Sequence, residues 1–243
     1  MASLLSWALS DIGQKRTSNE DCFFNSDKHG LFIVADGMGG HLGGEEASKT
    51  AIETSSLFII NSLESHNTPD IQAILDEAVN KSAQEVFSQS KSCPNLRGMG
   101  TTLSMMAIMN NQAFIAHIGD SRIYCLRDNK LKLLTADHSL VNEQVMAGLL
   151  SEDDARKSSL RNIITRAIGQ TQSVNADKLT IKIQPNDVFL LCSDGLNGML
   201  KDEEIESIIA KNHPSIAIKY LIEQANAKGG NDNITAILVK VVC

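Results

Sequence analysis

Short apolar runs separated by turn residues predict a series of β-strands in the middle of the chain. Four of them follow one another closely, at residues 101–109, 112–119, 121–127 and 130–134. They are separated by Asn110-Asn111 and Asp128-Asn129, dipeptides typical of tight turns between strands. Two further runs, 177–184 and 187–193, flank Pro185-Asn186 and predict another hairpin. Strands joined by such short turns pair antiparallel.

Helical spacing of apolar residues predicts helices before and after these strands. The first expected helix starts at Gly43-Gly44. Four more are expected at about residues 69–90, 139–170, 202–211 and 214–228. Pro69 is placed in the first turn of its helix, and residues 234–242 form a last strand. Because strict alternation of strands and helices is lacking, a doubly wound parallel sheet is disfavoured. We predict an α+β fold of two mainly antiparallel sheets packed together, with helices outside.

Three predicted strands end at an acidic residue beside a small residue. The runs that begin at Leu31, Ala113 and Val188 end at Asp36-Gly37, Gly119-Asp120-Ser121 and Asp194-Gly195. Asp232 precedes the last strand, and Glu20 and Asp21 lie near the start of the chain. A strand end is a rigid position, and a small neighbour leaves room for an ion and its waters. The pattern indicates a metal site built from carboxylates that are far apart in sequence.

The ligand types indicate which ion and which reaction such a site serves. Oxygen ligands without a pair of zinc-spaced His or Cys residues favour Mg²⁺ or Mn²⁺. Two such ions about 3.5–4 Å apart stabilise both oxygens of an in-line phosphoryl displacement. Arg16, near Asp21, adds a planar fork that suits bidentate binding of phosphate. The residues therefore favour hydrolysis of a phosphate ester.

Composition excludes several other classes. A chain of 243 residues with 42% hydrophobic content is long enough for one domain with a full core, and we expect a single domain over residues 1–243. The net charge of -7 and the lack of a Lys/Arg-rich run argue against nucleic-acid and membrane partners. No apolar run approaches the roughly 18 residues of a membrane span, and no positively charged leader is evident. The five cysteines lack CxxC spacing, which favours a reducing cytoplasm. We also expect a monomer.

Eight segments of the chain together carry a family resemblance. They are DIGQKRTSNED (11–21), VADGMGGHLGGE (34–45), MGTTL (99–103), AHIGDSRIY (116–124), DHSLVNEQVMAGLL (137–150), NIITRAIG (162–169), LLCSDGL (190–196) and GGNDNITAILV (229–239). These segments resemble the metal-dependent protein serine/threonine phosphatases of type 2C, and above all their compact bacterial members. The resemblance runs in family order from about residue 8 to residue 241. It implies a central sandwich of two antiparallel sheets flanked by helices on both sides, in four layers of the order αββα.

The resemblance also implies roles for the candidate residues in binding two core ions, Mn²⁺ or Mg²⁺. Asp36 corresponds to the family's bridging aspartate, and the carbonyl of Gly37 to a ligand of the second ion. Asp194 and Asp232 correspond to the acids that complete the shell of the first ion. Arg16 corresponds to the phosphate-binding arginine, so Arg16, Asp36 and Asp194 are the expected catalytic residues.

The remaining acids correspond to outer positions of the same centre. Glu20 and Asp21 match the acids that hold the second ion directly or through water. Asp120 matches the ligand of a third, weaker ion that it would share with Asp194. Met38 stands where animal members carry a histidine thought to protonate the leaving group, so the resemblance leaves the general acid open. His41 is not assigned that role.

Residues 139–170 correspond to a flap beside the active site that shapes access of protein substrates. Arg161 and Arg166 are the basic residues expected to attract a phosphorylated peptide there. His117 and His138 are expected to satisfy hydrogen bonds of the core or of turns. Thr101 and Thr102 are expected to be ordinary strand residues, with a hydrogen bond that supports the metal ligands as the alternative.

The leading function is Mg²⁺- or Mn²⁺-dependent hydrolysis of phosphoserine and phosphothreonine in proteins, opposing a serine/threonine kinase. Two alternatives stay open. One is a phosphatase-like module that binds phosphoproteins without hydrolysing them, although such relatives typically lose metal-binding acids that this chain retains. The other is a metal-dependent hydrolase of small phosphate esters, which the ligands alone do not exclude.

Overall fold

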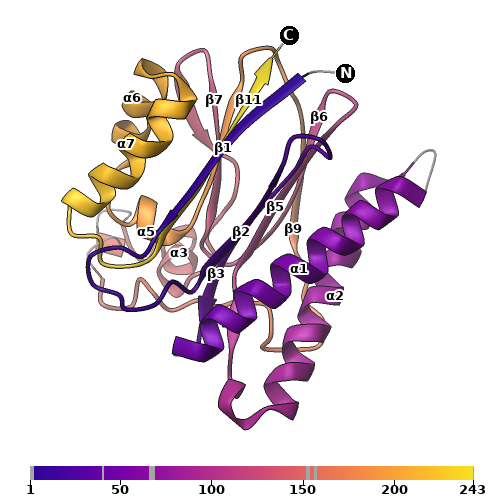
Figure 1. Ribbon diagram of the computed structural model, residues 1–243. Helices are drawn as coiled ribbons and strands as arrows, with labels where there is room; N and C mark the ends of the chain where they lie inside the picture. The colour runs from indigo at the N-terminus through magenta and orange to yellow at the C-terminus, as the bar shows by residue number, and fades with distance from the viewer. Residues whose placement is uncertain (1–2, 40, 66–68, 152–153, 156–157, 243) are drawn as a thin grey trace.

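Two antiparallel sheets pack face to face, and helices cover both outer faces (Figure 1). The computed structural model describes residues 3–39, 41–65, 69–151, 154–155 and 158–242. The first sheet has five strands in the order β1 (Ser3–Asp11), β11 (Ile234–Val242), β10 (Val188–Cys192), β7 (Arg122–Arg127) and β8 (Lys130–Leu133). The second has six, in the order β2 (Asp21–Ser26), β3 (Leu31–Met38), β5 (Leu103–Met109), β6 (Gln112–Ile118) and β9 (Asp177–Lys182), with β4 (Gly100–Thr101) paired to β3.

The helices flank the sandwich as predicted. The long helices α1 (His41–Ser65) and α2 (Ile71–Ser92) lie on the second sheet, followed by a 3₁₀ turn at Pro94–Leu96. The helices α6 (Asp202–Lys211) and α7 (Pro214–Ala227) lie on the first sheet, and the short helix α5 (Asp194–Asn197) follows β10. The predicted four-layer αββα arrangement is confirmed.

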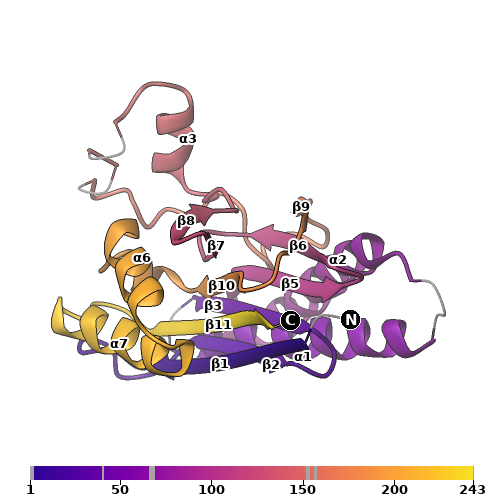
Figure 2. The same cartoon turned by 90° about the horizontal axis from the view of Figure 1, so that it is seen from above.

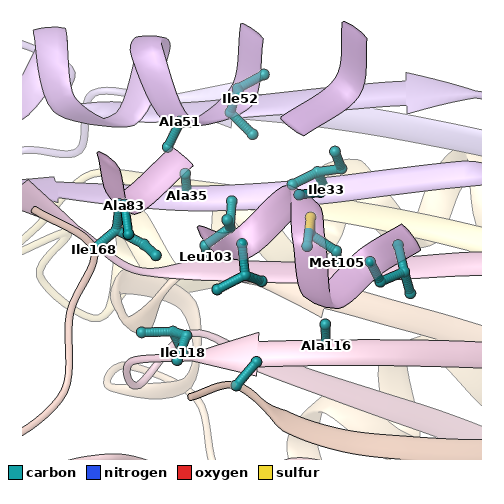
Figure 3. Close-up of a cluster of buried hydrophobic side chains, with 14 of the residues drawn as sticks. Ile33, Ala35, Ala51, Ile52, Ala83, Leu103, Met105, Ala116, Ile118 and Ile168 are labelled. Carbon is teal, nitrogen blue, oxygen red and sulfur yellow. The ribbon is translucent and has the colours of Figure 1, made fainter. Parts of the chain in front are cut away.

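Three apolar layers hold these elements together, and the side-chain alternation of β3 contributes to two of them. Ile33 and Ala35 pack with α1 and α2, as Figure 3 shows for Ala51, Ile52 and Ala83 of those helices. The alternate residues Phe32 and Val34 enter the layer between the two sheets. A third layer lies between the first sheet and α5, α6 and α7. Among the described helices, none is both long and apolar enough to cross a membrane.

The predicted hairpin at 177–193 is wrong. β9 pairs with β6 in the second sheet, whereas β10 lies between β11 and β7 in the first. Asn186, with a φ of 70°, turns the chain from one sheet to the other, and its N–H donates to the carbonyl of Val241. β9 is largely exposed and suits a sheet edge, whereas β10 is buried throughout and suits a central position. The turn signal located the bend, but burial decided the pairing.

Helix boundaries also differ from those predicted. α2 begins at Ile71, because Asp70 caps it by accepting a hydrogen bond from the N–H of Ala73, so Pro69 precedes the cap. α1 begins at His41, before Gly43-Gly44. The helix predicted over 139–170 is much shorter in the structure: α3 covers Leu140–Met146, and turns make up much of the rest of this region where the structure describes it. Figure 2 shows α3 standing away from the sandwich. The charged residues Glu152, Asp153, Arg156 and Lys157 lie outside the described residues.

Antiparallel pairing brings the candidate acids to one end of the sandwich. The end of β3, with Asp36, lies beside the beginning of β2, where Asp21 is its register partner. The end of β10, which Asp194 follows, lies beside the beginnings of β7 and β11. Asp120 and Asp232 each lie two residues before one of those strands.

Candidate metal centre

A cavity of about 350 Å³ opens at this end of the sandwich. It is lined by Arg16, Glu20, Asp36, Gly37, Met38, Gly39, Asp120, Asn162, Ile164, Asp194 and Asp232. The structure thus brings together every candidate residue except Asp21, which lies behind the lining. Asn162 was not anticipated, because an isolated asparagine in a charged segment carries no distinctive signal.

The backbone of Asp36 is fixed by two threonines. Its N–H donates to Oγ1 of Thr102 at 2.8 Å, and its carbonyl accepts from the N–H of Thr102 and from Oγ1 of Thr101, both at 2.9 Å. Oγ1 of Thr102 also lies 2.8 Å from Oγ of Ser121. These bonds fix the peptide that carries the central acid of the cavity. The threonines are therefore more than ordinary strand residues, in agreement with the alternative of a supporting hydrogen bond, and their role becomes visible only when β3 and residues 101–102 pair.

Asp21 lies behind the cavity, on the side of β2 that faces the first sheet. Its Oδ2 accepts a hydrogen bond from Oγ of Ser193 at 2.7 Å, whereas its Oδ1 is buried without a hydrogen-bond partner. Burial is the main cause that raises the pKa of Asp21 to about 7, and the nearby Asp194 and Asp232 add to it. A cation near this carboxylate would supply the missing interaction.

The glycines beside the acids are required by close approach of the backbone. A Cβ at Gly37 would lie 2.0 Å from the carbonyl oxygen of Gly44, and one at Gly195 would lie 1.9 Å from that of Asn233. We had expected these small residues to leave room for an ion. The structure shows that their first requirement is packing of the chain segments that carry Glu20 and Asp232.

Asn233 ties together the two ends of the chain at the site. Its Oδ1 accepts from the N–H of Glu20 at 2.8 Å, and its Nδ2 donates to the carbonyls of Ile12 and Ser18, both at 2.9 Å. Its side chain thus holds the segment that contains Arg16 and Glu20 beside β11. This residue was not predicted, because its partners are more than 200 positions away in sequence.

The acids raise one another's affinity for protons. Burial, and next the charges of neighbouring aspartates, raise the pKa of Asp36 and of Asp120 well above the usual value for a carboxyl group. Burial and the charge of Asp232 raise the pKa of Asp194 to about 6. Oδ1 of Asp120 is, like Oδ1 of Asp21, buried without a hydrogen-bond partner. Arg16 forms an ion pair with Asp232, so the other aspartates are short of positive charge and donors, which a divalent cation or a proton would supply.

This donor set fits Mg²⁺ or Mn²⁺. Within the described residues, no three His, Cys, Asp or Glu side chains form a ready-made ligand group by themselves. Mg²⁺ takes one or two carboxylates and keeps several waters, so it does not require such a cage. Several buried oxygens around an open cavity meet that requirement better than they meet the tetrahedral N/S requirement of zinc.

The other residues considered in the sequence differ in whether they line a cavity. His117 and His138 satisfy buried hydrogen bonds, as expected. Arg161 lines a second cavity of about 700 Å³ that shares Asp120, Asn162 and Asp194 with the first. Arg166 does not line either cavity but forms an ion pair with Asp177. The side chain of His41 lies outside the described parts of the chain.

The family model of protein phosphatase 2C matches residues 13–238. The chain belongs to the protein phosphatase 2C family. It is 38% identical over 234 residues to the serine/threonine phosphatase Stp of Listeria monocytogenes, covering 95% of this chain and 93% of that protein. It is also 38% identical over 238 residues to the protein phosphatase PhpP of Streptococcus pneumoniae, covering 96% of each.

Solved structures of protein phosphatase 2C relatives agree with the fold. The serine/threonine phosphatase PstP of Mycobacterium tuberculosis superposes with a TM-score of 0.91 at 33% identity, over 100% of both chains. A catalytic domain of PstP in complex with two manganese ions gives a TM-score of 0.90, also at 33% identity and full coverage. The predicted family, α+β fold and enzyme class, a protein phosphatase, are confirmed.

Proposed function

We propose that this chain hydrolyses phosphoserine and phosphothreonine in proteins and requires Mn²⁺ or Mg²⁺ for the reaction. The supporting observation is the cavity lined by Arg16, Asp36, Asp194 and Asp232, in a chain of the protein phosphatase 2C family. The manganese ions bound by its structural relative PstP support the choice of ion. When bound, a pair of such ions lowers the pKa of water to make a nucleophile and stabilises the charge of the phosphoryl group.

The proposed ligands divide by position. Asp36 and the carbonyl of Gly37 lie at the end of β3. Asp36 would hold both core ions and the carbonyl of Gly37 the second, while Asp194 and Asp232 would complete the shell of the first. Glu20 and Asp21 serve the second ion directly or through water. Asp120 would serve a third, weaker site shared with Asp194, whose charge is, after burial, the next cause that raises the pKa of Asp120.

Arg16 is proposed to orient the phosphate. Its guanidinium lies on the cavity wall, and its planar fork suits two phosphate oxygens. Met38 also lines the cavity, and a thioether has no proton to donate. The proton that the leaving serine or threonine needs therefore does not come from the side chain at this position.

The whole chain is proposed to act as one catalytic domain, with residues 139–170 as a flap over the substrate. The second cavity, between this segment and α5 and α6, adjoins the first and is about twice its volume. That extension suits residues flanking a phosphorylated side chain and favours a protein over a small phosphate ester. We further propose that the chain works as a cytoplasmic monomer on substrates of a serine/threonine kinase, as its acidic net charge and its cysteine pattern suggest.

Phosphate release from a phosphothreonine peptide, measured with a chelator and then with Mn²⁺, tests the proposal. We expect release only with the ion, and a loss of at least about a hundredfold in Asp36→Asn, in line with the loss of a strong electrostatic contribution. Binding of the peptide by wild-type protein without release of phosphate would instead indicate a phosphoprotein-binding module. A strong preference for nucleotides over the peptide would indicate a hydrolase of small phosphate esters.

A further inference from the structure

A buried histidine holds the peptide that precedes Asp120. His138 lies in the loop between β8 and α3, and only 4% of its surface is exposed. The N–H of Gly119 donates to Nδ1 of His138 at 3.0 Å, and the carbonyl of Gly119 accepts from the backbone N–H of His138 at 2.8 Å. His138 therefore binds both polar backbone groups of Gly119, the residue directly before Asp120.

The Gly119 peptide has little other freedom. Its φ of +105° is open mainly to glycine, and a Cβ there would lie 2.5 Å from Cγ2 of Thr102. The next side chain, Asp120, has a buried Oδ1 without a hydrogen-bond partner. Because no side-chain bond fixes that oxygen, the direction of the Asp120 carboxylate depends on the backbone that His138 holds.

The opposite edge of the imidazole faces Asp177, which in turn contacts Arg166 at the end of the predicted flap. Nε2 of His138 lies 3.2 Å from Oδ2 of Asp177, the first residue of β9, in contact but without the geometry of a hydrogen bond, and Nη1 of Arg166 donates to Oδ1 of Asp177 at 2.8 Å. The carbonyl of His138 accepts from the N–H of Thr165 at 2.8 Å. One residue thus connects the turn that carries Asp120 with residues 165–166 at the end of the flap.

The chemistry of the ring agrees with this geometry. Nδ1 accepts a hydrogen bond, so a neutral ring carries its proton on Nε2, toward Asp177. Burial lowers the pKa of His138, which favours the neutral form. The neighbouring ring of His117, with its centroid 4.8 Å away, adds no charge, because burial lowers its pKa to about 4.

We propose that His138 is a positioning residue for Asp120: it orients the carboxylate through the Gly119 peptide and couples that carboxylate to Asp177 and Arg166. The inference depends on the proposed role of Asp120 as a ligand of a divalent cation. It assigns His138 no contact with the substrate and no proton transfer. It predicts that the divalent cation site at Asp120 responds to changes in residues that do not reach the cavity.

Two substitutions of similar polarity separate the two edges of the ring. In His138→Asn, Oδ1 takes the place of Nδ1 and still accepts from Gly119. In His138→Gln, the amide reaches the place of Nε2, toward Asp177, but leaves the Gly119 N–H without its acceptor. Mn²⁺ binding to the full chain is measured by calorimetry, phosphopeptide turnover as a function of Mn²⁺ is followed in parallel, and circular dichroism verifies folding.

We expect His138→Asn to bind Mn²⁺ nearly as wild type does, and His138→Gln to lose about tenfold or more in affinity at the weakest site, as is usual when the support of a metal ligand is removed. In His138→Gln the Mn²⁺ concentration for half-maximal turnover also rises, while the Mn²⁺ affinity of the tighter sites stays unchanged. Equal Mn²⁺ affinity in His138→Gln and wild type, or equal loss in both variants, overturns the inference. Failure of wild-type protein to hydrolyse the peptide overturns the proposed function instead, since the calorimetric comparison does not depend on turnover.

A measurement on the wild-type chain covers the case in which both variants unfold. Nitrogen-15 spectra of the imidazole report which ring nitrogen carries the proton. We expect the proton on Nε2, with Nδ1 coupled to the Gly119 amide across the hydrogen bond, and a shift of that amide on addition of Mg²⁺. A proton on Nδ1, or a Gly119 amide that does not respond to Mg²⁺, contradicts the assignment.

Discussion

Arg16 donates a hydrogen bond from Nη2 to Oδ2 of Asp232 over 2.6 Å, so residues near opposite ends of the chain meet in the cavity. The other oxygen of Asp232 accepts from the N–H of Asn233 at 2.9 Å. The hydrogen bond between the side chains of Arg16 and Asp232 is the main cause that raises the pKa of Arg16, which therefore keeps its charge. The pairing holds the guanidinium at the wall where we propose that phosphate binds.

Replacement of Arg16 by lysine tests whether the fork or only the charge matters. We expect Arg16→Lys to lower kcat/KM for a phosphopeptide about 10- to 100-fold, the equivalent of one or two charged hydrogen bonds. Lys15 provides the control, since it is exposed and lies outside the cavity lining. Unchanged kcat/KM in Arg16→Lys, or an equal loss in Lys15→Gln, would contradict a specific role for the guanidinium.

The sequence predicted the strands and the acidic residues at their ends because both are local signals. A run such as 31–38 must be buried on both faces, and the acid at its end has to lie at the rim of the sheet. The layers and the antiparallel pairing of neighbours in sequence followed from short turns. The same reasoning failed at Pro185-Asn186 and again at 119–121, between β6 and β7, because in both places a short connection joins the two sheets and burial by distant strands decides the pairing.

The supporting residues of the site could not be predicted in the same way. Asn233, Thr102 and Ser193 act through hydrogen bonds to residues between 66 and 221 positions away. Single asparagine, threonine and serine residues occur in every loop and strand, so their role becomes visible only with their partners. The sequence shows the glycines beside the acids. It does not show which distant segments pack against them, and this packing is what requires a glycine.

Gly195→Ala is expected to disrupt the site through packing. Its Cβ would lie 1.9 Å from the carbonyl oxygen of Asn233, so the backbone that presents Asp194 and Asp232 has to move. We expect a destabilisation of about 1–3 kcal/mol, typical of overpacking, together with a strong loss of turnover. Gly148→Ala is the control: nothing lies within 4 Å of its Cβ, and its φ of +70° costs stability only by backbone strain. Both changes are measured by urea unfolding and phosphopeptide turnover; loss of turnover in Gly148→Ala alone would refute the packing argument.

Thr102→Val removes a hydroxyl group while keeping the shape of the side chain. The N–H of Asp36 then loses its acceptor and Ser121 loses a partner in a buried position. We expect a loss of about 1–3 kcal/mol in the free energy of unfolding, the usual penalty for an unsatisfied buried group. Thr180→Val in β9 serves as the comparison, because its hydroxyl bonds Gln72 at an exposed position. Similar unfolding free energies for the two variants would show that the hydroxyl of Thr102 does not secure Asp36.

Divalent cations are expected to stabilise the protein more at neutral pH than in mild acid. The pKa of Asp21 is raised to about 7 and that of Asp194 to about 6, from 3.8 for an ordinary aspartate. Between these values the unfolded chain has lost protons that the folded chain retains, so these groups lower the stability of the metal-free protein as pH rises from about 4 to about 7. Mn²⁺ replaces those protons and offsets the repulsion between the carboxylates.

Thermal unfolding with chelator and with Mn²⁺, at about pH 5 and about pH 7.5, measures this effect as the gain in Tm. We expect the larger gain at the higher pH, and a smaller gain in Asp36→Asn at both. A gain in Tm that is independent of pH, or that Asp36→Asn retains in full, would show that Mn²⁺ binds elsewhere.

Arg161 is expected to contribute to binding of protein substrates, whereas Arg166 has a structural partner. Arg161 is exposed and lines the larger cavity beside the candidate metal centre, and Arg166 is engaged with Asp177. Arg161→Ala should therefore lower kcat/KM for a phosphopeptide severalfold, chiefly at low salt where an exposed charge attracts an anionic ligand. Turnover of a small aryl phosphate should stay unchanged, because that substrate does not extend into the larger cavity.

Arg97→Ala, which removes an exposed arginine outside both cavities, is the matched control. Equal effects of Arg161→Ala on both substrates would place its role at the metal centre rather than in peptide binding.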